Sequence, residues 1–271
     1  MIFIVELFEK SLIETGRQSS KGNQLKWKDN GIWFKADYTG YEGLSEYVVS
    51  HLLQKSTLSP SEYVVYEPEQ IKYKAVIFNG CRSTDFSCGW QVITAERLFK
   101  KQYGISLNAC IYALENVCDR LKYLTEQVER ISGIKDFGKY MGKLLTIDAL
   151  FLNEDRHTHN ISVLMDGMGS FKLCPIYDNG AALLSDTTMD YPLGIDVYNA
   201  IKAVKAKTLC DSFEEQLDAA ESLYGPCISF FWNEKDVLQL LEEVGCYEKR
   251  ITERVLEVLL EQRRKYAYLF N

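Results

Sequence analysis

Apolar residues recur along the chain at two different spacings, and the spacing changes near residue 94. Before this position, short apolar runs bounded by turn-forming residues predict strands at 2–8, 25–28, 32–35, 63–66 and 74–78. After it, apolar residues recur mostly every three or four positions and predict helices at 95–101, 106–124, 135–152, 208–220, 234–244 and 246–269. We therefore expect an α+β protein with a β-rich first part and a mainly helical second part.

The clearest turn lies at Asn30-Gly31, between two strand-like runs. This pair favours a tight hairpin because both of its residues readily adopt a positive φ. In the second strand of the hairpin, Lys35 stands among aromatic residues. A Lys in such a place either has a function or lies at the sheet edge with its charge in water. A helix is predicted next, over residues 41–53, where apolar residues return at helical spacing.

Composition places the chain among ordinary globular proteins. It has 271 residues, of which 46% are hydrophobic and 25% charged, enough for one large or two small domains around a real core. The net charge is −7, from 31 basic and 38 acidic side chains. Because no long basic tract occurs, we expect no nucleic-acid partner.

Cysteines and the N-terminal stretch bear on the compartment. None of the eight Cys forms a Cys-x-x-Cys pair, and several lie in apolar stretches, as reduced buried thiols do. The first nine residues are apolar but too short and too acidic for a signal peptide. No apolar run reaches membrane-spanning length. We therefore expect a cytoplasmic protein without a transmembrane segment, or an effector secreted without a recognisable signal peptide.

The richest chemistry lies between residues 153 and 180. The polar stretch 153–160 is followed by a predicted hairpin that ends at Asp178. Asp155 and Asn160 are five positions apart, the offset between the catalytic Asp and the metal-binding Asn of protein kinases. Phosphoryl transfer from Mg-ATP needs such a set: one carboxylate for the attacking hydroxyl, and an Asn and a second carboxylate for Mg²⁺. The spacing predicts Asp155 as the catalytic residue, with Asn160 and Asp178 as metal ligands.

This stretch has two other interpretations. A polar loop with Asp, Asn and His is often only a solvated turn. Alternatively, His157 and His159 with nearby Asp residues suit a transition metal, but the remaining His is His51 and no Cys pair has metal-ligand spacing. The nucleotide interpretation is preferred, because apolar segments bracket the loop closely.

Two acidic residues lie in the helix that follows the first hairpin. Glu46 is one turn inside the helix, among apolar positions, and is the expected partner of Lys35. Glu42 is the second choice, because a carboxylate near a helix start is also stabilised by the helix dipole. In kinases a Lys on such a strand contacts the α- and β-phosphates. The loop around Gly22 would then cover the phosphates with backbone N–H groups, a simple turn being the alternative.

Three ordered motifs resemble those of the HipA-like kinase family. The family's Ser-x-Gly-x-Gln-x-Lys loop is similar to residues 20–26, its Asn-x-Asp-x-His-x-x-Asn stretch to 153–160, and its Leu-x-Pro-x-Tyr-Asp stretch to 173–178. The sequence at 155–160 also resembles the catalytic loop of phosphatidylinositol 3-kinase-like enzymes. Order and spacing agree from about residue 18 to residue 185, over half of the chain.

The resemblance implies a two-lobed protein-kinase-like fold, with a small β-rich N-lobe over residues 1–84 and a larger helical C-lobe over 85–271. It implies ATP- and Mg²⁺-dependent phosphorylation of Ser or Thr on a protein substrate. The catalytic residues would be Asp155, Lys35 and Glu46, and Mg²⁺ would be held by Asn160 and Asp178. The residues implied in nucleotide binding are Ser20, Gly22, Gln24, Lys35, His157, Asn160 and Asp178.

Family members include toxins of toxin–antitoxin pairs and secreted effectors, and they autophosphorylate a Ser in the phosphate-covering loop. Here the candidates are Ser19 and Ser20. The chain departs from the family in having Asn179 where others continue with Leu, and in lacking an obvious extra N-terminal domain. Two alternatives stay open: a nucleotide-binding pseudokinase that acts as an interaction module, and a kinase of a lipid or small molecule. The oligomeric state is not encoded in any pattern of the sequence.

Overall fold

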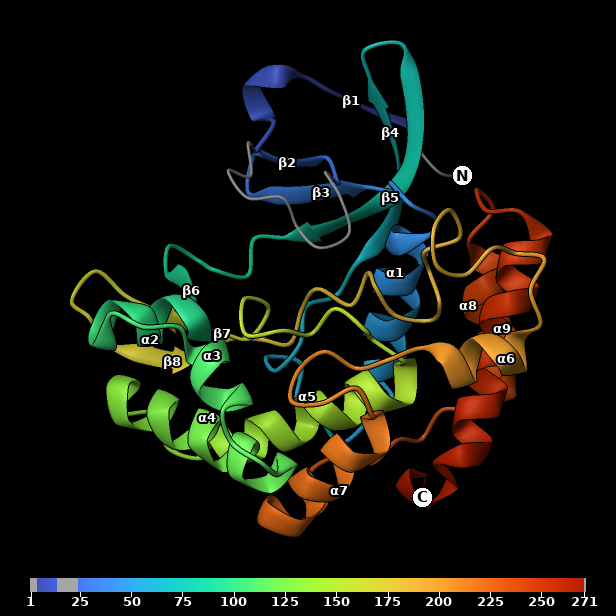
Figure 1. Ribbon diagram of the computed structural model, residues 1–271. Coiled ribbons are helices and arrows are strands. Elements are labelled where there is room, and N and C mark those ends of the chain that lie inside the picture. Colours follow the sequence, from blue (N-terminus) through green and yellow to red (C-terminus); the bar gives the residue numbers. More distant parts are fainter. Residues whose placement is uncertain (1–3, 14–23, 271) are drawn as a thin grey trace. The chain divides into compact units, whose positions relative to one another are not determined.

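The computed structural model describes residues 4–13 and 24–270. The chain forms two compact units, each with its own sheet and helices (Figure 1). The first unit consists of Met1–Phe86, Tyr177–Val204 and Phe230–Asn271, and the second of Ser87–Ile176 and Lys205–Ser229. The division into lobes at residues 84 and 85 stays a prediction, since these units group residues by packing and join two later stretches to the N-terminal one.

A five-stranded sheet forms the β-rich part of the first unit. Its strands are β1 (Ile4–Leu7), β2 (Lys26–Asp29), β3 (Ile32–Ala36), β4 (Glu67–Tyr73) and β5 (Val76–Thr84), in the order β1-β4-β5-β3-β2. Strand β1 is parallel to β4 and the other neighbours are antiparallel. The hairpin predicted at Asn30-Gly31 is confirmed, with φ of 48° and 77° at its two turn residues. Trp27, Phe34 and Ile71 are buried together on the sheet.

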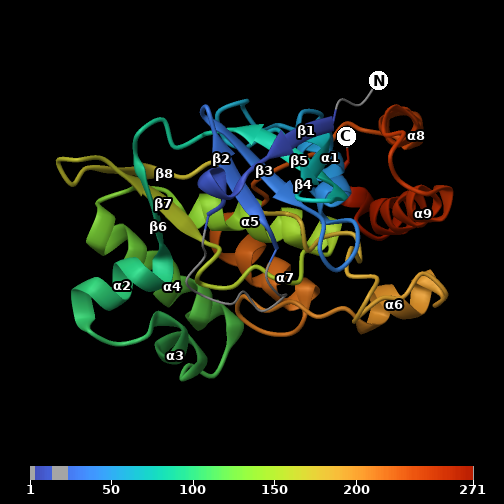
Figure 2. The same ribbon diagram turned by 90° about the horizontal axis from the view of Figure 1, so that it is seen from above.

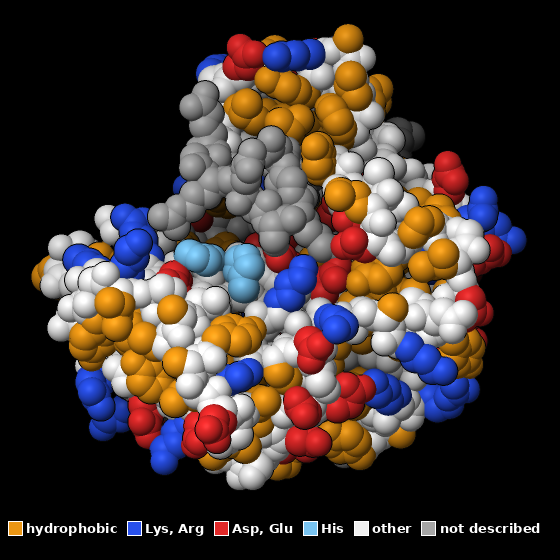
Figure 3. Space-filling model, in the orientation of Figure 1, with side chains coloured by type: hydrophobic (Ala, Val, Ile, Leu, Met, Phe, Trp, Pro, Cys, Tyr) orange, Lys and Arg blue, Asp and Glu red, His pale blue; other side chains and the backbone are white. Residues whose placement is uncertain are grey.

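The strands predicted at 63–66 and 74–78 are wrong in their bounds. Residues 63–66 precede β4, and their apolar side chains, Val64 and Tyr66, are buried against Cys81 rather than paired in a strand. The chain turns between β4 and β5 at Lys74, which has a positive φ of 56°. Figure 3 shows hydrophobic side chains on the surface over this hairpin, where Val76 and Ile77 are about half exposed.

Helices complete the first unit: α1 (Glu42–Leu53), α6 (Val197–Ala203), α8 (Glu234–Glu243), α9 (Lys249–Lys265) and the 3-10 helices η1 (Glu9–Ser11) and η2 (Ala267–Leu269). Helix α1 packs against β4, β5 and α8, and ten of its twelve residues are buried. A helix that is covered on every side is a core helix. Helix α6, which the sequence pattern did not predict, packs against α9 (Figure 2).

The second unit combines a small sheet with a helical core. Strands β6 (Gln91–Thr94), β7 (Ser162–Met165) and β8 (Phe171–Leu173) are antiparallel, and β6 was not predicted. The helices are α2 (Ala95–Tyr103), α3 (Leu107–Tyr112), α4 (Val117–Ser132), α5 (Phe137–Phe151) and α7 (Phe213–Tyr224). The single helix predicted over 106–124 is two helices, because the side chain of Asn116 accepts the N–H of Asp119 and begins a new one.

Helix α5 is the centre of this unit. It packs against α4 and α7, and most of its residues are buried. It ends at Leu152, whose φ of 57° turns the chain directly into the polar stretch 153–160. Over residues 4–13 and 24–270, none of the helices combines the length and the apolar character needed to cross a bilayer.

Candidate active site

Lys35 lies on β3 and joins two carboxylates of the first unit. Its Nζ is 2.5 Å from Oε1 of Glu46 on α1 and 2.7 Å from Oδ1 of Asp178. Lys35 is 8% exposed and Glu46 is 1% exposed. Burial alone would lower the pKa of Lys35, but Asp178 and Glu46 outweigh it and hold the pKa well above its usual value. The ammonium is therefore charged at any physiological pH.

Glu42 is not the partner of Lys35 in this structure. Its carboxylate instead accepts the backbone N–H groups of Tyr38, Thr39 and Gly40, at 3.1, 2.8 and 3.2 Å, and the Thr39 hydroxyl at 2.8 Å. Glu42 thus fixes the loop that leads into α1 and leaves Glu46 to pair with Lys35.

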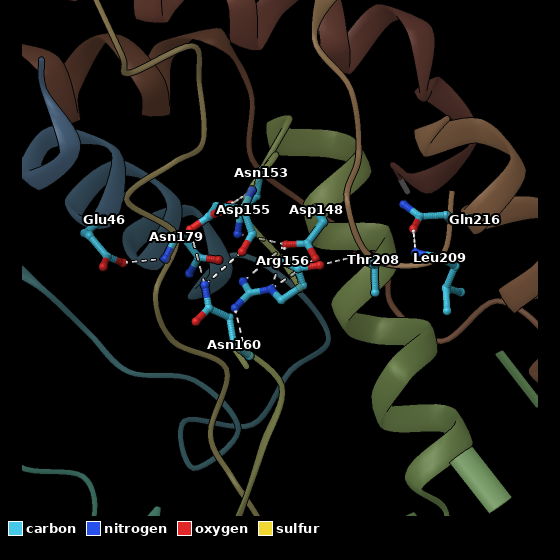
Figure 4. Close-up of polar contacts among 10 residues, drawn as sticks. All are labelled: Glu46, Asp148, Asn153, Asp155, Arg156, Asn160, Asn179, Thr208, Leu209 and Gln216. Carbon is cyan, nitrogen blue, oxygen red and sulfur yellow. Dashed lines mark hydrogen bonds and ion pairs between the residues drawn. The ribbon is translucent and has the colours of Figure 1, made fainter. Parts of the chain in front are cut away.

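Glu46 also holds the chain beside Asp178. Its second oxygen, Oε2, accepts the backbone N–H of Asn179 at 2.8 Å (Figure 4). Asp178 has a positive φ of 62°, a conformation that Asp adopts more readily than most residues. Because the contact at Asn179 uses only its backbone, the departure from Leu at this position does not alter it.

The segment after Asp178 is hydrogen-bonded along α1. Ser45 Oγ donates to the carbonyl of Ala182 at 2.9 Å, and Tyr41 Oη donates to that of Leu183 at 2.7 Å. The N–H of Tyr41 then bonds to the carbonyl of Ser185 at 3.1 Å. The segment therefore runs back along the helix from Glu46 towards its N-terminal end.

Two features show how tightly this segment is held. Leu183 and Leu184 both have a positive φ, of 57° and 59°, and both are buried. At Gly40 a Cβ atom would lie 1.9 Å from the carbonyl oxygen of Ser185, so a side chain there would push the two stretches apart. A left-handed leucine costs free energy, which the surrounding contacts must offset.

In the second unit, Asp155 and Asn160 are neighbours in one turn. Asn160 Nδ2 donates to the backbone carbonyl of Asp155 at 2.8 Å and lies 3.5 Å from its Oδ2. The Asn160 amide oxygen accepts no hydrogen bond from the described residues. The Asp155 side chain is 14% exposed. The two predicted functional groups are thus brought together, with an oxygen ligand still available on Asn160.

A buried ion pair supports this turn from below. Arg156 Nε lies 3.1 Å from Oδ2 of Asp148 on α5, and each side chain is 1% exposed (Figure 4). Arg156 also donates to the Asn160 carbonyl at 3.3 Å, and Asn153 donates to Asp148 at 3.0 Å. Burial raises the pKa of Asp148, against the opposing effect of Arg156 and Asn153. The pair was not identified from the sequence.

Further contacts fix the loop at both of its sides. Thr208 Oγ1 donates to the carbonyl of Arg156 at 2.5 Å, in the segment before α7 (Figure 4). On the other side, Thr158 Oγ1 donates to Glu96 at 3.1 Å, and Glu96 also accepts the N–H of Asn108 at 2.9 Å. Burial tends to raise the pKa of Glu96, but these and other hydrogen bonds outweigh it, and its pKa is lowered.

Neither Thr208 nor Glu96 was identified from the sequence. Both are ordinary polar residues far along the chain from the loop that they hold. The sequence around Thr208 offers one weak indication of its role: a hydroxyl residue stands next to the apolar Leu209, shortly before a helix.

The remaining predicted site residues make few contacts in the structure or lie outside its described part. His157 is partly exposed, and its Nε2 lies 4.0 Å from Asp155 Oδ1. Gln24 is partly exposed, two residues before the start of β2. Ser19, Ser20 and Gly22 lie outside the described residues. Within the described part of the chain, no group of three or more His, Cys, Asp or Glu residues is placed to hold a metal ion, so no third ligand accompanies His157 and His159.

The fold has a counterpart among solved structures. It is similar to the proinflammatory kinase CtkA of Helicobacter pylori, with a TM-score of 0.63, 17% sequence identity, and coverage of 96% of this chain and 95% of that one. This is a kinase fold. The α+β kinase-like fold predicted from the sequence is therefore confirmed.

A second similar structure is HipA of Shewanella oneidensis MR-1, in a complex with HipB and operator DNA. The TM-score is 0.42 and the identity 10%, with coverage of 96% of this chain and 63% of that one. No protein-family model and no curated protein sequence matches the chain.

Proposed function

We propose that the protein is an ATP- and Mg²⁺-dependent kinase that transfers the γ-phosphoryl group to a Ser or Thr hydroxyl of a protein. The observation that carries this proposal is Lys35, buried on a strand of a kinase fold and bonded to both Glu46 and Asp178. A Lys held by a helix carboxylate, beside a metal-binding Asp, is what phosphoryl transfer requires.

The residues present fit Mg-ATP. Mg²⁺ prefers hard oxygen ligands and is commonly bound through one or two protein groups together with phosphates and water. Asp178 supplies a carboxylate whose side chain is 26% exposed, and Asn160 supplies an amide oxygen that accepts no hydrogen bond from the described residues. Mg-ATP would bring the phosphoryl donor and the charge that neutralises its β- and γ-phosphates.

Each side chain then has a defined task. Lys35 provides a permanent positive charge for the α- and β-phosphates, and Glu46 keeps its Nζ in place. Asp155 orients the attacking hydroxyl and accepts its proton. The buried Arg156–Asp148 pair fixes the turn that carries Asp155 and so keeps its carboxylate in position.

Specificity for Ser or Thr on a protein, and autophosphorylation at Ser19 or Ser20, rest on the motif resemblance. Both Ser residues belong to the loop proposed to cover the triphosphate. A phosphate on either one would add nearly two negative charges next to the triphosphate, and repulsion would weaken ATP binding. A cytoplasmic location or secretion as an effector is equally part of the proposal.

Incubation of the purified protein with γ-labelled ATP, Mg²⁺ and a cell lysate tests the proposal. Label should appear on protein bands, on Ser or Thr after hydrolysis, and should disappear with Asp155→Asn. Mg-ATP binding without transfer to protein, lipid or small molecule would identify a pseudokinase. Label confined to a lipid or small-molecule fraction would replace the protein substrate with another class.

A further inference from the structure

An aromatic ring covers the ammonium group of Lys35 in the first unit. Lys35 Nζ lies 5.1 Å from the centroid of the Tyr66 ring, and Tyr66 is 2% exposed. A cation over an aromatic face is attracted by the negative face of the ring, and the attraction is stronger where water is excluded. Here both groups are buried, so the contact has the features of a strong one.

Helix α1 positions this ring as well as the carboxylate. The backbone N–H of Tyr66 donates to Ser50 Oγ at 3.1 Å, and Ser50 is fully buried. Ser50 follows Glu46 by four residues, so both lie on one face of α1. One helix face therefore sets two neighbours of Lys35: a carboxylate directly, and a ring through the backbone of Tyr66.

The ring differs from a third carboxylate in an important respect. An ammonium has three N–H donors, and Glu46 and Asp178 already accept two hydrogen bonds from Lys35. A ring attracts the charge without a strong acceptor atom, so it holds the ammonium while one donor remains for a phosphate oxygen. Burial, and to a smaller extent the negative charge of Glu46, holds the pKa of Tyr66 well above its usual value, so the ring stays a neutral phenol.

We propose that Tyr66 is a positioning residue for Lys35, holding its ammonium by a cation–π contact so that the remaining N–H donor faces the phosphates of the nucleotide. This inference rests on the proposed function in its last step. The contact between Tyr66 and Lys35 is independent of it. The competing explanation is that Tyr66 only fills space in the core.

Substitutions at Tyr66 and at a nearby control position separate these explanations. Tyr66→Phe keeps the ring, and Tyr66→Met replaces it with a flexible apolar side chain of adaptable shape. Tyr63→Leu is the matched control, since Tyr63 is in the same segment and is 7% exposed. Tyr66→Leu serves as a second variant should the Met variant fail to fold. Each variant is first compared with the parent protein by thermal melting.

The primary measurement is the rate at which an acylating reagent modifies Lys35, read by mass spectrometry against Lys249, whose side chain is 87% exposed. Lys35 should react faster in Tyr66→Met than in the parent, and at the parent rate in Tyr66→Phe and Tyr63→Leu. Equal rates in Tyr66→Met and Tyr63→Leu would overturn the proposal. So would a Tyr66→Phe variant that behaves like Tyr66→Met.

The second measurement is kinetic. With ATP as varied substrate, Tyr66→Met should lower kcat/KM about tenfold, while Tyr66→Phe should stay within about twofold of the parent. Unchanged kcat/KM in Tyr66→Met, in an active parent, would overturn the last step of the proposal. Absence of turnover in the parent would instead count against the proposed function, and the acylation rates would still decide whether Tyr66 holds Lys35.

Discussion

Arg156 and Asp148 form an ion pair in which both side chains are 1% exposed, directly below the turn that carries Asp155. Removing one partner of such a pair leaves the other charge buried without compensation. Arg156→Met should therefore lower the free energy of unfolding by about 3–5 kcal/mol, measured by urea denaturation. Arg130→Met, at an exposed position on α4, is the control and should change it by less than about 0.5 kcal/mol.

The double variant Asp148→Leu/Arg156→Met sharpens this test. Replacing both charges with apolar side chains removes the uncompensated carboxylate, so part of the lost stability should return. A double variant no more stable than Arg156→Met would show that the loss comes from packing rather than from the buried charge of Asp148.

Asp155→Asn should abolish turnover while the fold and ATP binding remain. The substitution keeps the size of the side chain but removes the proton acceptor, a change worth about 10²–10⁴-fold in rate. Steady-state kinetics with labelled ATP and calorimetric titration with Mg-ATP measure the two effects. Asp218→Asn, at an exposed position on α7, should leave both unchanged. Turnover within tenfold of the parent would remove Asp155 from the catalytic role.

Lys35→Ala should abolish turnover and also lower stability at neutral pH. Lys35 bonds to the buried Glu46 and to the partly exposed Asp178, so its loss leaves two carboxylates without the cation that joins them. Removing one of these charges as well, in Lys35→Ala/Glu46→Gln, should restore part of the lost stability. Thermal melting at pH 7 measures both variants, with Lys28→Ala on the same hairpin as the control. A double variant no more stable than Lys35→Ala would contradict the electrostatic explanation.

Asp37 makes stability depend on pH in the opposite sense to most carboxylates. Burial, and to a smaller extent the charge of the nearby Glu42, raises the pKa of Asp37 to about 7. The N–H of Gly43 and the hydroxyl of Tyr247 donate hydrogen bonds to Asp37 at 2.6 and 2.8 Å and only partly oppose this rise. In the unfolded chain this pKa is 3.8. The folded state therefore holds the proton more tightly, and the stabilising contribution is complete below about pH 4 and is lost as the pH rises through 7.

Asp37→Asn removes this titration. Urea denaturation at half-unit steps from pH 5 to pH 8 should show a smaller loss of stability in Asp37→Asn than in the parent. Glu253→Gln on α9 is an exposed control that should follow the parent. Parallel curves for the parent and Asp37→Asn would show that Asp37 is already ionised throughout this range.

Local patterns made much of the first unit and the turn of Asp155 and Asn160 predictable. Asn30-Gly31 is enough to indicate a hairpin, and the hairpin places Lys35 on its second strand. Glu46 was a better candidate than Glu42 because it stands among apolar positions, and those positions proved to be buried on every side of α1. In each case the relevant neighbours lie within a few residues of each other.

Contacts between distant residues were not predictable in this way. Tyr66 lies just before a strand, not in it. Its side chain is buried, and in the sequence the apolar run that contains it is typical of a strand. Thr208 lies 52 residues from Arg156, and nothing near either residue indicates that a hydroxyl meets a carbonyl there. Asp148 and Arg156 are eight residues apart, across a helix end at which the left-handed residue is Leu152 rather than the usual Gly or Asn.

The left-handed leucines after Asp178 restrict which sequences can build this protein. From Glu46 back to Tyr41 the helix rises only about 7.5 Å, whereas an extended stretch from residue 179 to 185 would span about 20 Å. Leu183 and Leu184 take up the excess by turning left-handed, while they remain 0% and 1% exposed. Val or Ile would clash with its own backbone there, and Gly or Asn would leave a void or an unpaired amide. Substitution at these two positions, and any insertion or deletion between 179 and 185, should therefore be tolerated far less than in an ordinary loop.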